Sequence, residues 1–183
     1  KNGWAPAAQN GIPCAFIVDR SSKVAWIGHP MSMDKPLEEI VNGSWDYEKA
    51  KKEHEKVLKE AKEDKKMRSE FKIAKETGNW SNYLSMMDTY IDKNKDDVRQ
   101  AQSLRMQKFM TCIMEVKNKT KAYQCAAIFA SKGWNNSSDL NMISWTIADE
   151  LDKEMQDLDF ALWVGKRACE LTNYKDSMII DTL

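Results

Sequence analysis

Cysteine thiols are the groups of this 183-residue chain that could most readily do chemistry. The cysteines are Cys14, Cys112, Cys125 and Cys169. No two of them have the C-x-x-C spacing that is typical of redox and zinc motifs. Cys112 and Cys125 fall in apolar helical patterns, where a free thiol packs as a small apolar side chain, with a disulfide as the alternative. Because His29 and His54 are the only histidines, we expect no metal site.

Charge and composition exclude several classes of partner. Lys and Arg number 28, and Asp and Glu number 28, so the chain lacks the one-signed field that captures nucleic acid or an acidic membrane surface. No apolar run approaches the roughly 20 residues that span a bilayer. The sequence starts at Lys1 without a signal peptide, and we expect that this is not the natural N-terminus.

Residues 10–43 have the pattern of a β-hairpin followed by a helix. Ala15 to Val18 is a continuous apolar run that predicts a buried strand, and Val24 to Gly28 predicts a second one after a polar turn. We expect Asp34 to be the N-cap of a helix with Pro36 in its first turn. The helix should end at Asn42 and Gly43, which tolerate the left-handed conformation.

This small segment cannot bury both strands by itself. An isolated hairpin is marginal in water. The cover could come from the C-terminal region or from a preceding piece of the same domain, and we favour the preceding piece because the chain starts abruptly.

From Trp45 onward the pattern is helical. Asp46 to Thr77 is rich in Lys and Glu with a sparse apolar stripe, which predicts a mostly solvated connecting helix. Gly78 and Asn79 should end it. The expected later helices start at Trp80, at Asp96 or Asp97, after the turn 117–119, at Leu140, at Asp157 and at Asp176.

Helices of this length joined by short polar turns predict antiparallel hairpins stacked as a solenoid. Aromatic and methionine side chains form a stripe along them, which we interpret as helix-to-helix core, with a ligand groove as the alternative. The stripe comprises Trp80, Met86, Met87, Met106, Met110, Met114, Trp145 and Trp163.

The stretch from Asn10 to Asp19, N-G-I-P-C-A-F-I-V-D, resembles the cis-proline loop of the thioredoxin superfamily. It is closest to TlpA-like and AhpC/TSA-type redoxins, in which a similar segment precedes the fourth strand. The second strand, Gly28 and the helix from Pro36 to Val41 follow in the family's order, so the resemblance covers about a fifth of the chain.

The resemblance implies that Pro13 is the cis-proline and that the backbone of Ile12 pairs with an extended substrate segment. An ordinary turn before a strand is the alternative. Cys14 stands where the family usually has Thr, and we expect it to be inert, with a resolving role as the alternative.

The family's reactive cysteines lie on the first half of the domain, which this chain does not contain. Without a dithiol at a helix N-terminus there is no low-pKa thiolate to exchange disulfides. We therefore expect no catalytic residue in this chain, no cofactor and no activity of the chain alone. The expected substrate-binding residues are Ile12 and Pro13.

The helical region is similar to the tetratricopeptide-like repeats that some bacterial redoxins carry C-terminally. Asp159 to Leu171 resembles the second helix of such a repeat, and Asp176 to Leu183 resembles the first helix of the next. Between Trp80 and Glu150 the small-residue consensus is poorly kept.

The sequence thus predicts a predominantly helical α+β chain in three parts. Residues 1–45 would be the C-terminal half of a thioredoxin-like domain, 46–78 a charged connecting helix and 79–183 a helical-repeat region. The expected function is that of a fragment of a thiol-disulfide oxidoreductase of the bacterial periplasm or cell envelope. Its substrate would be a thiol or disulfide protein, and its helices would bind protein or peptide partners. A non-catalytic redoxin-fold scaffold and a peroxiredoxin-type peroxidase are the alternatives.

Overall fold

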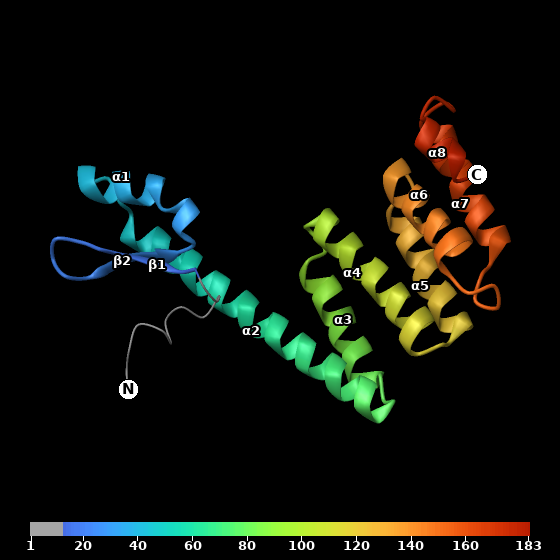
Figure 1. The fold of residues 1–183 in the computed structure, drawn as a ribbon, viewed down its shortest axis with the longest axis horizontal. Coiled ribbons are helices and arrows are strands. Elements are labelled where there is room, and N and C mark those ends of the chain that lie inside the picture. Colours follow the sequence, from blue (N-terminus) through green and yellow to red (C-terminus); the bar gives the residue numbers. More distant parts are fainter. Residues whose placement is uncertain (1–12) are drawn as a thin grey trace. The chain divides into compact units, whose positions relative to one another are not determined.

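The computed structural model describes residues 13–183 and is mostly helical, with one small antiparallel sheet (Figure 1). This confirms the predominantly helical α+β class. The chain divides into two compact units, one up to Ser69 and the other from Glu70 to Leu183. Among the described helices, none is long and apolar enough to cross a bilayer.

The first unit begins with the predicted hairpin. Strand β1 (Ala15–Val18) pairs antiparallel with β2 (Val24–Gly28), and Phe16 lies opposite Ile27. The backbone N–H of Asp19 donates to the carbonyl of Lys23 at 2.8 Å and closes the turn. Both strands have the bounds that the sequence predicts.

Helix α1 (Asp34–Asn42) follows a short 3₁₀ turn, η2 (Pro30–Ser32). The expected N-cap at Asp34 is wrong, because the cap position is Met33 and no side chain caps the helix. The turn η2 leads directly into α1, so the backbone before Asp34 is already helical, whereas a capping side chain needs an extended residue. Asp34 instead lies in the first turn, where its charge favours the helix dipole.

The other end of α1 agrees with the sequence. Gly43 has a φ of 78°, and its N–H donates to the carbonyls of Glu39 and Ile40. This left-handed cap needs a residue without a Cβ.

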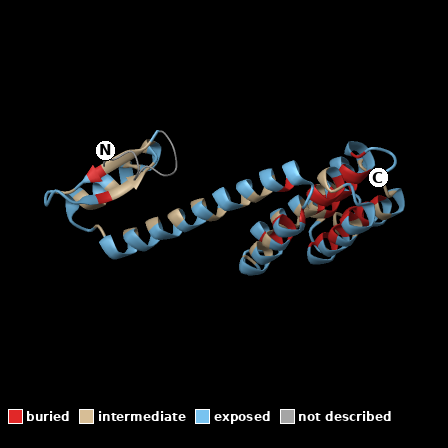
Figure 2. Cartoon of the chain, turned by 90° about the horizontal axis from the view of Figure 1, so that it is seen from below, coloured by how far each residue is buried: buried red, intermediate tan, exposed pale blue. Residues whose placement is uncertain are grey.

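Helix α2 (Tyr47–Thr77) is the predicted connecting helix and extends through the boundary between the two units. Most of its surface is exposed, as Figure 2 shows. Lys56 and Glu60, four residues apart, form an ion pair at 3.9 Å. Gly78, with a φ of 71°, follows the end of the helix. The structure confirms a solvated helix that ends at Gly78.

The second unit contains helices α3 to α8 and two π-helical turns, η3 and η4. Their bounds are α3 Ser81–Lys93, α4 Val98–Met110, η3 Thr111–Glu115, α5 Lys119–Lys132, α6 Ser137–Trp145, η4 Thr146–Glu150, α7 Leu158–Leu171 and α8 Ser177–Asp181. Helix α4 packs against α3 and α5, and α6 packs against α7. The region is helical, as the sequence predicts, and its neighbouring helices pack in pairs.

The helix N-caps reveal an internal repeat. The side chains of Asp97, Asn136 and Asp176 cap the first helices of successive hairpins, and Asn118 and Asp157 cap the second helices. Equivalent caps are 39 or 40 residues apart. This spacing is longer than the 34 residues of a tetratricopeptide repeat. The resemblance of the helical region to tetratricopeptide repeats therefore stays a prediction.

The second unit buries most of the core (Figure 2). The fully buried large side chains include Phe109, Phe129, Leu140, Ile143 and Val164. The aromatic and methionine stripe is divided between core and surface.

The core part of that stripe includes Trp80 and Met87, as expected. Met114, Trp145 and Trp163 are exposed, so the core interpretation is wrong for them. Helical spacing identifies a face of a helix, but the neighbouring hairpins decide which faces are covered.

Two of the first helices, α4 and α6, do not end as regular α-helices. The chain continues from α4 into η3, where the N–H of Val116 donates to the carbonyl of Thr111. The hydroxyl of Thr111 also donates back to the carbonyl of Gln107 at 2.9 Å. Such a side-chain bond competes with the regular backbone pattern and bends helices. Similarly, α6 continues into η4. Helix α6 begins at Ser137, three residues before the expected start at Leu140.

Replacing Asp97 by alanine should destabilise the second unit by about 1 kcal/mol. The Asp97 carboxylate accepts a hydrogen bond from the N–H of Gln100 at 3.0 Å, and alanine leaves that donor without its cap. The neighbouring Asp96→Ala variant is the control, and it should change the free energy of unfolding little. Urea unfolding followed by circular dichroism measures both, and equal effects would contradict the assignment of Asp97 as the cap.

Candidate functional site

The residues that the sequence predicts to bind substrate lie at the start of the first unit. Ile12 is outside the described residues. Pro13 is exposed and immediately precedes Cys14 and β1. Both Pro13 and Cys14 line a pocket of about 840 Å³, with walls from β2, α1 and the first turns of α2. The predicted binding residue therefore lies beside a large concave surface.

Two tryptophans shape this pocket. Trp45 follows α1, and its indole N–H donates to the carbonyl of Ala25 at 3.1 Å, which ties this segment to β2. A Cβ at Gly28 would lie 2.4 Å from the ring of Trp26. Gly28 thus allows the Trp26 ring to fold against the strand end, which gives a physical reason for a glycine at this position.

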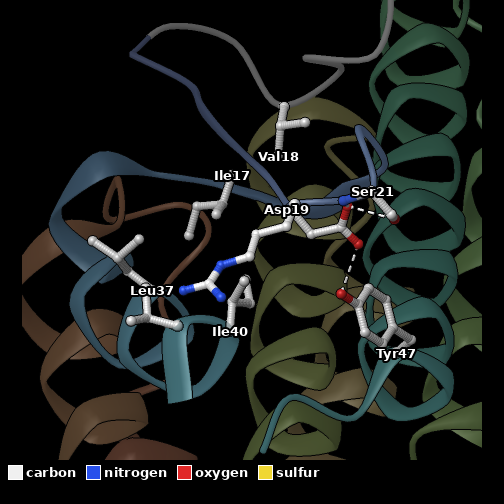
Figure 3. Close-up of a pocket in the computed structure, with 9 residues that line it drawn as sticks. Ile17, Val18, Asp19, Ser21, Leu37, Ile40 and Tyr47 are labelled. Atoms are coloured by element: carbon white, nitrogen blue, oxygen red, sulfur yellow. Dashed lines mark hydrogen bonds between the residues drawn. The ribbon is translucent and has the colours of Figure 1, made fainter. Parts of the chain in front are cut away.

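A second pocket, of about 380 Å³, lies between the hairpin and α1 (Figure 3). Its apolar lining comes from Ile17, Val18, Leu37, Ile40 and Val41. Its polar lining comes from Asp19, Arg20, Ser21 and Tyr47. The pocket therefore combines an aliphatic wall with one hydrogen-bonded polar side.

Asp19 organises the polar side of this pocket. One of its carboxylate oxygens accepts hydrogen bonds from the N–H and the hydroxyl of Ser21 and from the N–H of Lys23, at 2.7–2.9 Å. The other accepts from the hydroxyl of Tyr47 at 2.7 Å. Figure 3 shows the Asp19 carboxylate between Ser21 and Tyr47. These bonds fasten the hairpin turn to the start of α2.

The same hydrogen bonds set the protonation states. The Lys23 N–H, followed by the side chains of Ser21 and Tyr47, lowers the pKa of Asp19 to about 2. The hydrogen bond to Asp19 in turn raises the pKa of Tyr47. At neutral pH Asp19 is thus ionised and Tyr47 protonated, and neither is suited to transfer a proton.

The Asp19 network should contribute stability only while Asp19 is ionised. Its folded-state pKa lies below the ordinary value of 3.8, so the contribution is present above that pH and is lost as the pH falls towards 2. We expect an NMR titration of the Asp19 carboxyl carbon to have a midpoint near 2. Tyr47→Phe should move it upward, whereas Tyr174→Phe, at an exposed tyrosine of the second unit, should not. A wild-type midpoint at 3.8 would contradict the network.

Among the described residues, no group of three or more His, Cys, Asp or Glu side chains is placed to hold a metal ion. Sequence reasoning missed the Asp19 network, although the Asp-x-Ser pattern of Asp19 and Ser21 is a turn signal that points to part of it.

The second unit has an aromatic cluster of Trp134, Trp163 and Arg167, in which Trp163 is exposed and the other two residues are half-buried. The rings of Trp134 and Trp163 are 4.7 Å apart, and the guanidinium of Arg167 lies 5.6 Å from the centre of the Trp134 ring. Trp163 is 51% exposed. Arg167 is also ion-paired with Glu170 at 3.1 Å, so the cluster offers an aromatic surface beside an ion pair, which suits contact with other proteins.

The second unit also brings two cysteines together. The sulfur atoms of Cys112 in η3 and Cys125 in α5 are 4.0 Å apart and buried, and both thiols are free. The sequence predicts both in the core, with a disulfide as the alternative; in the structure both are buried and remain free thiols. The available signal for their contact was their nearly equal distance from Asn118 in the turn, six residues before it and seven after it, because such residues of an antiparallel helix pair lie at a similar level.

No family model, curated protein or solved structure matches the chain.

Proposed function

We propose that residues 13–45 form the substrate-facing wall of a thioredoxin-like thiol-disulfide oxidoreductase domain, and that the helical repeats bind protein partners. The observation that carries the proposal is the position of Pro13, directly before an antiparallel hairpin and a helix and at the edge of the larger pocket. This order of loop, hairpin and helix is that of the redoxin resemblance.

Exposed aliphatic side chains support this proposal. Val18, Val24, Leu37 and Val41 lie on the hairpin and α1 and are exposed, Val41 by 64%. A two-stranded sheet with so little cover is marginal in water. In the proposed domain, further strands outside the described residues would cover this face.

The chemistry of the proposed domain is thiol-disulfide exchange. A thiolate of the parent protein would attack a substrate disulfide, and the substrate segment would lie extended along Ile12 and Pro13. Proline has no backbone N–H, which leaves this position without a competing donor. Cys14 is a single thiol, so the present chain should have no reductase activity. The parent protein would act in the bacterial periplasm or cell envelope.

The test uses the full-length parent protein in a disulfide-reduction assay. Pro13→Ala should lower kcat/KM by about 10- to 100-fold. The reason is that a displaced substrate segment no longer holds its disulfide in line with the attacking thiolate. Pro30→Ala, in the turn before α1, is the control and should have little effect. A parent without reductase activity, or equal effects of both variants, would contradict the proposal.

The aromatic cluster favours a second candidate function, that of a non-catalytic scaffold that binds peptides. Residues 70–183 form a compact unit and can be tested alone against a peptide library. The scaffold function predicts that Trp163→Ala loses binding, while Tyr174→Ala, at another exposed aromatic residue, keeps it. Absence of binding, together with reductase activity of the parent protein, would favour the first proposal.

A further inference from the structure

The buried pair Cys112 and Cys125 has a chemical capacity that the proposed function does not use. The two sulfurs are 4.0 Å apart in the core between η3 and α5. Cys112 is fully buried, and Cys125 is 9% exposed. A disulfide needs the sulfurs at about 2.05 Å, so a shift of roughly 2 Å would allow the bond to form.

The internal repeat shows that packing does not require thiols here. At the 39-residue spacing of the repeat, the position equivalent to Cys112 is Leu151, which directly follows η4. Cys125 is the seventh residue of α5, and Val164 is the seventh residue of α7. Leu151 is buried, with 5% of its surface exposed, and Val164 is fully buried. The fold therefore needs only apolar side chains at these two positions, and the cysteine pair adds reactivity to one hairpin.

The position of Cys112 in a π-helical turn is a second relevant feature. Such turns depart from regular helix geometry and are frequent at functional sites. Because η3 directly precedes the turn before α5, a small local adjustment there would move the sulfur of Cys112 towards α5 without displacing either whole helix.

The surroundings distinguish the two thiols. The contact with the sulfur of Cys112 lowers the pKa of Cys125, whereas burial of the thiol raises it; the nearby Lys108 and Lys121 also lower it. The charge of Asp88, which is ion-paired with Lys108, opposes them. The same contact raises the pKa of Cys112. Cys125 is also the more exposed of the two residues, at 9% against 0% for Cys112, so it is the thiol that a small oxidant meets first and that attacks.

We propose that Cys112 and Cys125 form a reversible oxidation site that hydrogen peroxide converts to an intrahairpin disulfide. The inference is independent of the proposed redoxin function. A peroxide is small enough to reach the nearly buried sulfur of Cys125, which a bulky disulfide is not.

The reaction has two steps. The thiolate sulfur of Cys125 attacks one peroxide oxygen, the O–O bond breaks, and the hydroxide that leaves takes up the proton released by Cys125 to give water. The sulfur of Cys112 then attacks the sulfenic sulfur of Cys125. The S–O bond breaks, and the hydroxyl leaves with the proton of Cys112 as a second water. Two thiols are oxidised, and one peroxide is reduced to two waters.

The test uses the full chain with Cys14→Ser and Cys169→Ala, so that the pair supplies the only thiols. After treatment with hydrogen peroxide, we expect both free thiols to be lost together. Intact-mass measurement should show the loss of two hydrogen atoms in a monomer with no added oxygen. Dithiothreitol should restore both thiols, and circular dichroism checks that the protein stays folded.

Single variants in the same background separate the two roles. With Cys112→Ala, Cys125 should accumulate as sulfenic acid that a dimedone probe labels. With Cys125→Ala, Cys112 should stay reduced under the same exposure. The proposal is overturned if both thiols of the parent background survive peroxide that oxidises free cysteine, or if they end as higher oxides or intermolecular dimers.

Discussion

Replacing Phe129 by alanine should destabilise the second unit by about 3–5 kcal/mol, the largest effect that we expect from a single side chain. Phe129 lies on α5 and is fully buried, and the backbone carbonyl of the same residue accepts a hydrogen bond from buried Gln102 of α4 at 3.2 Å. Removing the ring leaves a cavity where α4 and α5 pack together. Urea unfolding followed by circular dichroism measures the loss.

The neighbouring residue provides the matched control. Ile128 is on the same helix and is 54% exposed. Ile128→Ala should change the free energy of unfolding by less than about 0.5 kcal/mol. Similar losses for Phe129→Ala and Ile128→Ala would show that the buried face of α5 is assigned wrongly.

Replacing Gly165 by alanine should also destabilise the second unit, by about 1–3 kcal/mol, although alanine is the better helix former. A Cβ at Gly165 of α7 would lie 2.8 Å from the hydroxyl oxygen of Ser144 of α6. That hydroxyl is buried and donates to the carbonyl of Ala161 at 2.9 Å. To make room, Ser144 must give up this hydrogen bond.

A double-mutant cycle separates the steric cause from helix propensity. Without the Ser144 hydroxyl, the nearest atoms to the new Cβ are 3.5 and 3.6 Å away, which is ordinary contact. In a Ser144→Ala background, Gly165→Ala should therefore be neutral or stabilising, by up to about 1 kcal/mol. An unchanged cost of Gly165→Ala in that background would place its cause elsewhere.

Local signals in the sequence were sufficient for much of the secondary structure. The two strands have their predicted bounds, and Gly43 and Gly78 end the helices that precede them, as expected. Asp97, Asn118 and Asp157 cap helices near the predicted starts. These features depend on the conformational freedom of glycine, on short side-chain acceptors and on apolar spacing, all of which act within a few residues.

Features that depend on neighbouring elements could not be predicted in this way. The cap of α1 moved to Met33 because η2 leads directly into the helix. Trp163 is exposed, although its apolar character predicts core. In both cases the same local sequence is compatible with two outcomes, and the surrounding structure decides between them.

In the candidate sites, too, some features follow from the sequence and others depend on the tertiary structure. The sequence by itself determined that the chain has four thiols without C-x-x-C spacing, a Pro13 before a strand, and helices at the observed places. The tertiary structure alone decided that Asp19 hydrogen-bonds Tyr47, 28 residues away, and that Cys112 faces Cys125. The physical reason is range: turns, caps and periodicity are fixed by contacts within one helical turn or one hairpin. The contact between two cysteines and the choice of the buried face of a helix depend instead on how separate elements pack.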